Sequence, residues 1–403
     1  MDSRAEFGYH LDVTGRIKTV GILGVLLVLV SLRFVNLESD PPLYFVGHGQ
    51  DQLTDPYHLT FHARNQVLYD QWNPFGYHRW DVFKHSIVSA VAYGAFSLAT
   101  PSRMVANVAA LVLQLGGIAL FLFGWRRLRG DREALIAAGL LLINSTLFFY
   151  GRLPFLENGL IFFCGLMFFV FVRYHDKLWG AALAGALVAL AALAGKLFGA
   201  LLMAPLLVTL FYQHRQLALK PVLCALGGFA GAGAVFILIV NGGQVTALMS
   251  YYTEQTVGMY GAPPGLSSVS NFFKMFATFG GESGLAEYTP ALILLSLFSL
   301  ILILVTTPEV FKFKSEFVPL VFAASWLIVG VLGLMPFLHR PMRYSLFLYL
   351  PMSALGAYAL NLAWQTKVRF RIHLPWIALP LIWFTLLYTG TQVVISFAKF
   401  GDR

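Results

Sequence analysis

The sequence predicts an all-α polytopic membrane protein with about 11 transmembrane helices in a single membrane domain over residues 1–403. Hydrophobic residues make up 58% of the chain and charged residues only 12%, whereas roughly 25% of residues are charged in soluble domains. Several apolar runs reach about 20 residues, the length needed to cross a hydrocarbon core of roughly 30 Å. Transmembrane β-barrels show short alternating segments instead, and the sequence contains none that we recognise.

The apolar runs follow one another in a regular series along the chain. They predict helices at about 17–36, 102–125, 133–150, 158–174, 178–195, 197–213, 221–240, 290–306, 317–335, 343–362 and 374–397. The run at 84–100 is shorter and is interrupted by serines and a tyrosine. We expect it to be a juxtamembrane helix in the interface rather than a span. Few residues follow the last helix, so we expect no soluble C-terminal domain.

The distribution of Lys and Arg predicts the orientation of the chain in the membrane. If 84–100 does not span, the short connectors alternate between basic and less basic, and the arginine-rich connector at 126–132 lies on the basic side. Cytoplasmic loops carry the excess of Lys and Arg. The N-terminus is therefore predicted to lie in the cytoplasm.

Two long polar segments fall on the external side in this topology. The first external loop covers 38–101 and contains the juxtamembrane helices, and the second, rich in Gly, Pro and Ser, covers 241–289. Arg33 lies near the end of the first helix, so we expect its side chain to extend to the membrane interface.

The net charge of +9 does not indicate binding to nucleic acid. The basic residues are dispersed between apolar runs, which is typical of membrane topology signals. The two cysteines, Cys164 and Cys224, both lie within apolar runs, and their number excludes a disulfide framework. Membrane lipids are therefore the expected surroundings and partners of the protein.

Polar motifs occur in a fixed order on the predicted external side. They are Asp51-Gln-Leu-Thr-Asp55-Pro-Tyr57 with Arg64, Lys84 before the juxtamembrane helix, Gly151-Arg152-Leu-Pro-Phe-Leu-Glu157, Gly195-Lys196-Leu-Phe-Gly199, and Arg343-Tyr344 with Pro351. Together they resemble the GT-C superfamily of integral membrane glycosyltransferases. The closer resemblance is to the branch that holds protein O-mannosyltransferases and lipid A aminoarabinose transferases.

The resemblance implies an enzyme that moves a sugar from a polyprenyl-phosphate carrier to an acceptor on the external face. The acceptor must lose a proton as it attacks the anomeric carbon, so a nearby carboxylate is the natural general base. Asp55 is expected to be that base, with Asp51 as the alternative. Either residue could instead be a solvated loop acid or a helix N-cap. Asp55 followed by Pro is typical of a helix start, and that role is compatible with catalysis.

The leaving group in such a reaction is a lipid phosphate, whose developing charge requires fixed cations in a site that excludes water. The candidate phosphate-binding residues are Lys84, Lys196, Arg340 and Arg343. Simpler interpretations remain, since Lys84 could anchor its helix at the interface and the two arginines could contact lipid headgroups. Lys196 adjoins an apolar run, where a cation is costly unless it is paired.

Further residues are expected to contact substrate or to shape its loops. They are Tyr57, Arg64, Arg152, Glu157, Glu254 and Tyr344. Arg152 and Glu157 share one external turn and could form a local ion pair, or Glu157 could contact substrate. Glu254 resembles an acidic residue of the aminoarabinose branch, although a solvated loop glutamate is the simpler interpretation.

No metal or other cofactor is firmly predicted. His58 and His62 are four residues apart and could share a helix face as metal ligands, but the sequence offers no third ligand at matching spacing. Oligosaccharyltransferase relatives use a divalent ion, so the resemblance leaves a metal open. The expected donor is a polyprenyl-phosphate sugar.

Two other functions remain open from the sequence. The chain could be a non-catalytic membrane subunit that keeps a glycosyltransferase scaffold inside a larger complex. It could also transport a lipid-linked glycan or a small molecule, although a transporter would favour mid-helix charges and inverted repeats. The family branch implies a bacterial inner membrane with a periplasmic active site. The acceptor could be a protein, a lipid or a polysaccharide.

Overall fold

The computed structural model describes residues 13–35, 37–38, 55–74, 83–215, 218–240, 242, 245–246, 270, 290–306, 315–335 and 342–365. Asp51, Arg340, Glu254, the expected helix 374–397 and nearly all of the loop 241–289 lie outside the described residues. Asp55 is described as part of a helix, without its side chain. The described ranges are helices joined by turns and contain no strand, which confirms the all-α prediction.

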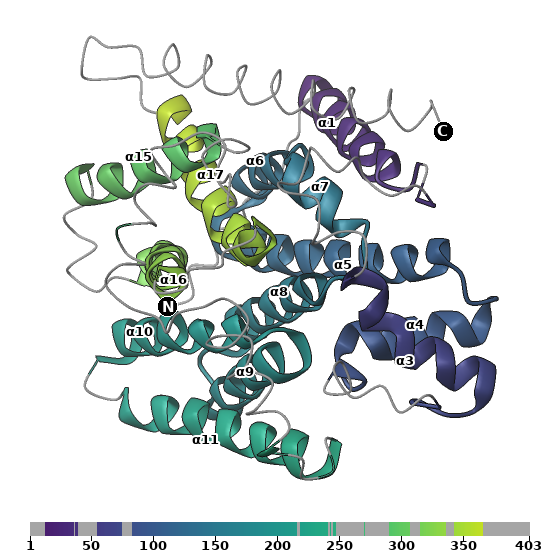
Figure 1. Cartoon of the computed structure of the whole chain (residues 1–403). Helices are drawn as coiled ribbons and strands as arrows, with labels where there is room; N and C mark the ends of the chain where they lie inside the picture. Colours follow the sequence, from purple (N-terminus) through teal and green to yellow (C-terminus); the bar gives the residue numbers. More distant parts are fainter. Residues whose placement is uncertain are drawn as a thin grey trace.

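The helices appear in Figure 1, coloured along the sequence. They are α1 (Val13–Leu32), α3 (Asp55–Tyr69), α4 (Ile87–Leu98), α5 (Arg103–Arg129), α6 (Asp131–Leu142), α7 (Ser145–Gly151), α8 (Leu156–Tyr174), α9 (Leu178–Leu190), α10 (Met203–His214), α11 (Leu219–Val235), α15 (Pro290–Thr306), α16 (Val318–Leu334) and α17 (Tyr349–Gln365). Within the described ranges, six helical segments are long and apolar enough to cross a membrane, or seven if α6 and α7 form one bent span. The protein is an integral membrane protein.

Helices α5 and α8 form the centre of the bundle. They run parallel: Gly117 of α5 lies against Ile161 of α8, and Gly124, further along α5, lies against Phe168, further along α8. Two glycines allow their close approach. A Cβ added at Gly165 would lie 1.9 Å from the Gly117 carbonyl oxygen, and one added at Gly117 would lie 2.4 Å from the Ile161 oxygen. The pair therefore forms a rigid axis from one end of the bundle to the other.

Helices α3 and α4 lie side by side beside one end of α5 (Figure 1). Ser86 caps α4 by accepting a hydrogen bond from the Ser89 backbone N–H at 3.1 Å. With 12 residues, α4 is shorter than the roughly 20 residues that a span requires. This length agrees with the expectation for 84–100, while the loop boundaries 38–101 stay a prediction.

The expected continuous helix at 133–150 is wrong. Helices α6 and α7 meet at a bend of 66°. Asn144 causes the break, because its side-chain oxygen accepts from the Leu147 backbone N–H at 2.9 Å and so caps a new helix. Asparagine favours this capping position over a helix interior.

The other expected helices that fall within the described ranges are found near their predicted positions, with local changes of helix type. Residues Ala191–Gly195 (η3) and Phe236–Val240 (η6) are π-helical. Leu197–Leu202 (η4), Ser315–Phe317 (η9) and Met342–Leu348 (η10) are 3₁₀-helical. Lys196 separates η3 from η4 in an extended conformation, with φ −141° and ψ 146°. The chain therefore breaks its helix at a lysine.

The expectation that Arg33 extends to the membrane interface is also wrong. Its side chain is fully buried inside the bundle, at 0% exposure. It donates hydrogen bonds to Gln114 and to backbone carbonyls of α6 and α7. The end of α1 is thus fixed to the centre of the protein.

Candidate functional site

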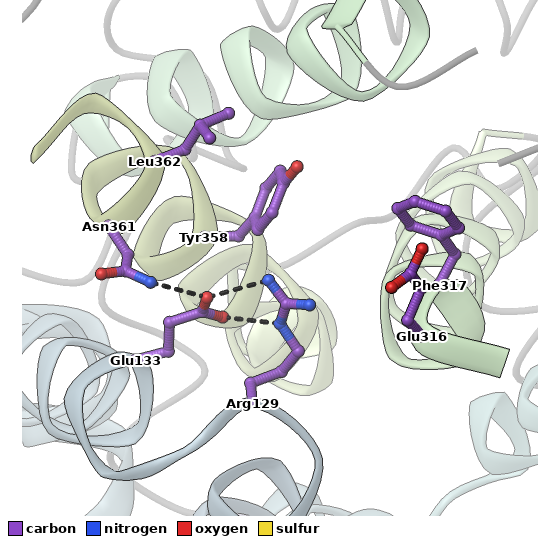
Figure 2. Close-up of a pocket in the computed structure, with 7 residues that line it drawn as sticks. All are labelled: Arg129, Glu133, Glu316, Phe317, Tyr358, Asn361 and Leu362. Carbon is purple, nitrogen blue, oxygen red and sulfur yellow. Dashed lines mark hydrogen bonds and ion pairs between the residues drawn. The ribbon is translucent and has the colours of Figure 1, made fainter. Parts of the chain in front are cut away.

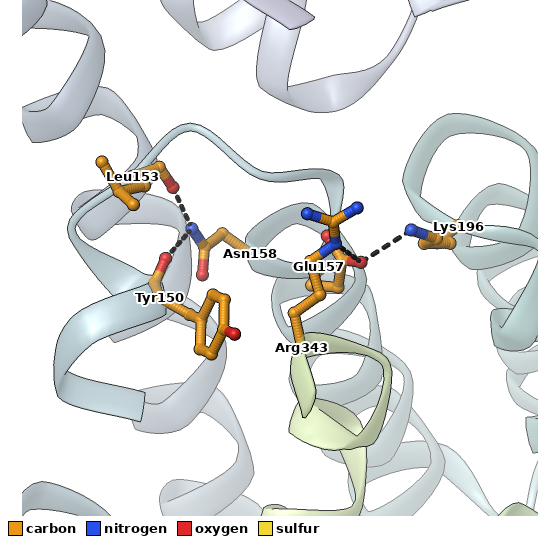
Figure 3. Close-up of polar contacts among 6 residues, drawn as sticks. All are labelled: Tyr150, Leu153, Glu157, Asn158, Lys196 and Arg343. Carbon is orange, nitrogen blue, oxygen red and sulfur yellow. Dashed lines mark hydrogen bonds and ion pairs between the residues drawn. The ribbon is translucent and has the colours of Figure 1, made fainter. Parts of the chain in front are cut away.

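Three residues from separate predicted motifs meet at one end of α8. Lys196 Nζ donates to Glu157 Oε1 at 2.7 Å, and Arg343 Nε lies 3.5 Å from the same oxygen (Figure 3). Glu157 is 2% exposed and Arg343 is 6% exposed. We call these three residues the Glu157 cluster. Its side chains carry one net positive charge.

The sequence positions each member of the Glu157 cluster at a helix boundary. Glu157 lies in the first turn of α8, Lys196 in the extended break between η3 and η4, and Arg343 in η10 just before α17. Helix boundaries let the backbone turn sharply, so long side chains from three segments can converge. None of the three is more than partly exposed.

Aromatic rings line the two cations of the cluster. Lys196 Nζ lies 3.9 Å from the ring centroid of Tyr344, and Arg343 Cζ lies 4.8 Å from that of Phe155. Phe198 packs against Tyr344 with the ring centroids 5.0 Å apart. Cation–π contacts of this kind stabilise a cation where little water is present. Tyr344, predicted to contact substrate, lies within this group.

The segment that carries Lys84 approaches the same place. A Cβ added at Gly159 would lie 2.3 Å from Ile87 Cγ2, so the start of α4 packs directly on the first turn of α8. Lys84 is half-buried, three residues before Ile87. The structure therefore brings the Lys84 segment beside Glu157, and Lys84 remains a candidate for phosphate binding.

The first-loop candidates lie on α3, which packs on the same end of α5. Tyr57 is half-buried, and its hydroxyl lies 3.4 Å from Asn107 Nδ2 of α5. Asp55 is the first residue of α3, as its helix-start pattern predicts. Arg64, further along α3, is exposed. Asp55 thus begins a helix at the cluster end of the bundle, and its catalytic role stays a prediction.

Arg152 is held apart from the immediate contacts of Glu157. Its Nη2 donates to the Val35 carbonyl at 2.6 Å, and its guanidinium lies 5.4 Å from the Phe148 ring centroid. Burial lowers the pKa of Arg152 to about 10, so it stays charged at neutral pH. The structure pairs Glu157 with remote cations, in place of the local pair considered from the sequence.

The histidine pair of the first loop has other contacts. His62 is buried, and its Nδ1 lies 2.8 Å from the Trp72 carbonyl. Within the described ranges, no group of three His, Cys, Asp or Glu side chains could hold a metal ion. The described part of the chain therefore supplies no metal centre at His58 and His62.

A chain of buried polar residues beside the cluster was not predicted from the sequence. Gln114 Nε2 donates to Asn158 Oδ1 at 3.3 Å, and Asn158 Nδ2 donates to the carbonyls of Tyr150 at 3.0 Å and Leu153 at 2.7 Å. Gln114 also accepts from Arg33. A polar amide within an apolar run was the available signal, because such a residue is buried only with partners.

A second buried glutamate, Glu133, lies in the first turn of α6, beside the other end of α5. Arg129 at that end follows Gln114 by 15 residues, or roughly 22 Å along the helix. Arg129 donates to both carboxylate oxygens of Glu133, at 3.0 and 2.9 Å, and Asn361 Nδ2 donates to Oε1 at 2.9 Å. This Glu133 cluster borders a cavity of about 230 Å³, with Glu316 and Phe317 on the facing wall (Figure 2). Its ion pair is internally neutral.

No protein-family model and no curated protein matches the sequence. Solved structures do match. ArnT from Cupriavidus metallidurans bound to undecaprenyl phosphate aligns with a TM-score of 0.52 at 18% identity, over 87% of this chain and 61% of that chain. The oligosaccharyltransferase of Archaeoglobus fulgidus tethered to an acceptor peptide aligns with a TM-score of 0.56 at 14% identity, over 94% and 55%.

The archaeal oligosaccharyltransferase AglB from Archaeoglobus fulgidus, in complex with an inhibitory peptide and a dolichol-phosphate, aligns with a TM-score of 0.52 at 14% identity, over 95% of this chain and 56% of that chain. This chain thus spans between about half and two thirds of the length of these neighbours. The matches show that the chain has a GT-C-like fold.

Proposed function

We propose that this protein, an integral membrane protein with a GT-C-like fold, is a glycosyltransferase that takes its sugar from a polyprenyl-phosphate carrier. The Glu157 cluster is the observation that carries this proposal. Lys196 and Arg343 are held around one carboxylate with a net charge of +1. Two neighbours of the same fold were solved with undecaprenyl phosphate and with a dolichol-phosphate.

The cluster suits a phosphate leaving group for an electrostatic reason. Cations that are fixed before the reaction stabilise developing negative charge without reorganisation, and they act more strongly where water is excluded. Glu157 keeps the two cations close together in the absence of ligand. A phosphate oxygen that approaches Lys196 and Arg343 replaces part of this interaction and neutralises the remaining charge.

Asp55 is the proposed general base. It begins α3, which packs with α4 on the end of α5 that also supports the Glu157 cluster. An acceptor bound between α3 and the cluster would face the anomeric carbon of a sugar whose phosphate contacts Lys196 and Arg343. The proposed location is the external face of a bacterial inner membrane, with the N-terminus in the cytoplasm.

The test is mass spectrometry of lipids that copurify in mild detergent. Wild type, D55N and R343M are compared with D131N as control, since Asp131 pairs with Arg126 at an exposed position of the other end. We expect a polyprenyl phosphate or its glycosylated form in wild type, its retention or enrichment in D55N, and its loss in R343M. The mass of the lipid also names the sugar class.

If no polyprenyl species appears in any sample, the proposed donor site is wrong. If the lipid copurifies but D55N leaves glycosylation of the cell envelope unchanged, Asp55 is not the base. That second outcome favours a non-catalytic subunit that binds the carrier within a larger assembly.

A further inference from the structure

Arg33 holds three helices together through one buried guanidinium. Its Nη1 donates to Gln114 Oε1 at 3.1 Å and to the Leu147 carbonyl at 3.0 Å. Its Nη2 donates to the carbonyls of Leu141 at 3.3 Å and Leu142 at 3.0 Å. The last carbonyls of a helix have no partner within the helix, so Arg33 satisfies the end of α6 at its bend towards α7.

The contact with Arg33 fixes which way the Gln114 amide points. A guanidinium only donates hydrogen bonds, so it must meet the amide oxygen, and the Gln114 NH₂ group must then face Asn158. Asn158 consequently accepts with its oxygen and donates with its NH₂ group to the carbonyl of Tyr150 in α7 and to that of Leu153 in the turn that follows. The three side chains form a relay with a single hydrogen-bond direction.

The relay packs tightly against that turn. A Cβ added at Gly151 would lie 2.0 Å from Gln114 Oε1, so the amide packs directly on the Gly151 backbone, in space that a larger residue would fill. Asn158 is 0% exposed and Gln114 is 0% exposed. Side-chain orientation is therefore transmitted from the end of α1 to the first turn of α8.

Asn158 and Glu157 are adjacent on α8 and point in different directions. Successive residues of an α-helix are rotated by about 100°, and Figure 3 shows Asn158 directed at Tyr150 and Leu153 while Glu157 faces Lys196 and Arg343. Fixing the direction of Asn158 therefore fixes the rotation of the first turn of α8, which in turn fixes the Glu157 carboxylate.

We propose that Arg33 is a positioning residue for the Glu157 cluster, acting through Gln114 and Asn158. This inference rests on the proposed function only for its consequence, the binding of a lipid phosphate. The geometric part concerns the Lys196–Glu157 contact and stands apart from any ligand.

The variant Q114E separates positioning from folding. Its carboxylate still accepts from Arg33, as a charge-assisted hydrogen bond that is stronger than the original. It can no longer donate to Asn158 Oδ1, so the relay is cut while Arg33 keeps its contact with residue 114. A buried network at the other end offers the matched control N361D, which places an acid beside Glu133 and disturbs folding without touching the relay.

The first readout needs no ligand. Lys196 Nζ is labelled with an amine-reactive acylating reagent in detergent-solubilised full-length protein, and the modification is quantified by mass spectrometry against exposed Lys177. We expect Q114E and R33M to raise Lys196 labelling about five- to tenfold, because the Glu157 contact that protects the amine is displaced. E157Q sets the upper limit, and N361D stays at the wild-type rate.

The second readout is binding of undecaprenyl phosphate in nanodiscs. We expect Q114E to weaken binding of undecaprenyl phosphate by about five- to tenfold, while the thermal stability of the variant stays at or above that of wild type. In an E157Q background the same change should have less than about a twofold effect, since the residue being positioned is gone.

Wild-type labelling in Q114E and R33M, with raised labelling in E157Q, would overturn the proposal. The proposal would also be overturned if Q114E weakened undecaprenyl phosphate binding equally with and without E157Q. Additive effects of the two substitutions would mean that Gln114 does not act through Glu157. If wild type does not bind undecaprenyl phosphate at all, the proposed function fails, and the labelling result still decides whether Arg33 positions the cluster.

Discussion

The two buried glutamates show how similar residues reach different roles. Glu133 and Glu157 are each 2% exposed, and each lies in the first turn of a helix. Glu133 receives a two-point contact from Arg129, four residues earlier in the chain, and one from Asn361. Glu157 receives its contacts from Lys196 and Arg343, which belong to distant segments.

The charge balance of the two clusters differs as well. The Glu133 ion pair is neutral and its carboxylate has three hydrogen bonds, so it has the character of a structural contact. The Glu157 cluster has two cations for one carboxylate, and one of them lies at 3.5 Å, beyond ordinary hydrogen-bond length. Surplus positive charge, with Arg343 at a longer distance from the carboxylate than Lys196, suits an anionic ligand.

The largest expected effect is on stability at the Glu133 cluster. E133A leaves Arg129 without its carboxylate in a largely buried position, which costs about 3 kcal/mol or more of unfolding free energy. Binding of undecaprenyl phosphate to the folded fraction should be unchanged. Thermal unfolding in detergent and a lipid-binding assay measure the two. If E133A weakened lipid binding as much as R343M does, the distinction between the two clusters would be lost.

The next effect breaks both clusters at once through the helices that connect them. G165A introduces a Cβ that would lie 1.9 Å from the Gly117 carbonyl, a backbone atom that cannot rotate away. Separating α5 from α8 should cost about 3 kcal/mol, measured by thermal unfolding. G94A is the control, because a Cβ there meets nothing within 4 Å. Equal stability of both variants would show that the α5–α8 contact is looser than described.

A binding effect of intermediate size is expected at the Glu157 cluster. R343M removes a charged donor to the proposed phosphate, worth about 2 kcal/mol or roughly 30-fold in the Kd for undecaprenyl phosphate. Isothermal titration or a competition assay in nanodiscs measures it. R127M, at an exposed position near the end of α5, should bind as wild type. If R343M and R127M lost affinity equally, the lipid would be attracted by the overall positive charge of the protein rather than by the Glu157 cluster.

The smallest effect is expected at the bend between α6 and α7, where Asn144 caps α7 and Arg33 donates to the last carbonyls of α6. N144A removes the N-cap of α7 and should cost about 1 kcal/mol of stability. N144D or N144S, which can also cap, should cost less. Denaturation curves compare the three. An N144A protein as stable as wild type would mean that Arg33 alone maintains the 66° bend.

The sequence predicted helices well and their interruptions poorly. Apolar runs locate a span because lipid solvation depends on local composition. The break at Asn144 was missed because a capping role depends on one side chain rather than on the run around it. The Asn-Ser-Thr triplet at 144–146 was a usable signal, since these residues prefer helix starts.

The candidate site was predicted in its members but not in its connections. Glu157, Lys196 and Arg343 were each selected from a short motif, and the structure brings them together. The pairing of Glu157 with Lys196 in place of Arg152 depends on how the break between η3 and η4 packs on α8, which no local pattern encodes. Arg33 was misjudged because its acceptors are mostly backbone carbonyls, which leave no mark in a sequence.

The burial of Arg33 also has a consequence for biosynthesis. Its acceptors follow it by 81 to 114 residues, and at about 5–20 residues per second a ribosome needs roughly 4 to 23 s to make them. During that interval the guanidinium has none of these partners, and the membrane interface is the place where it can remain hydrated. Helix α1 can thus be locked in place only after α5, α6 and α7 exist.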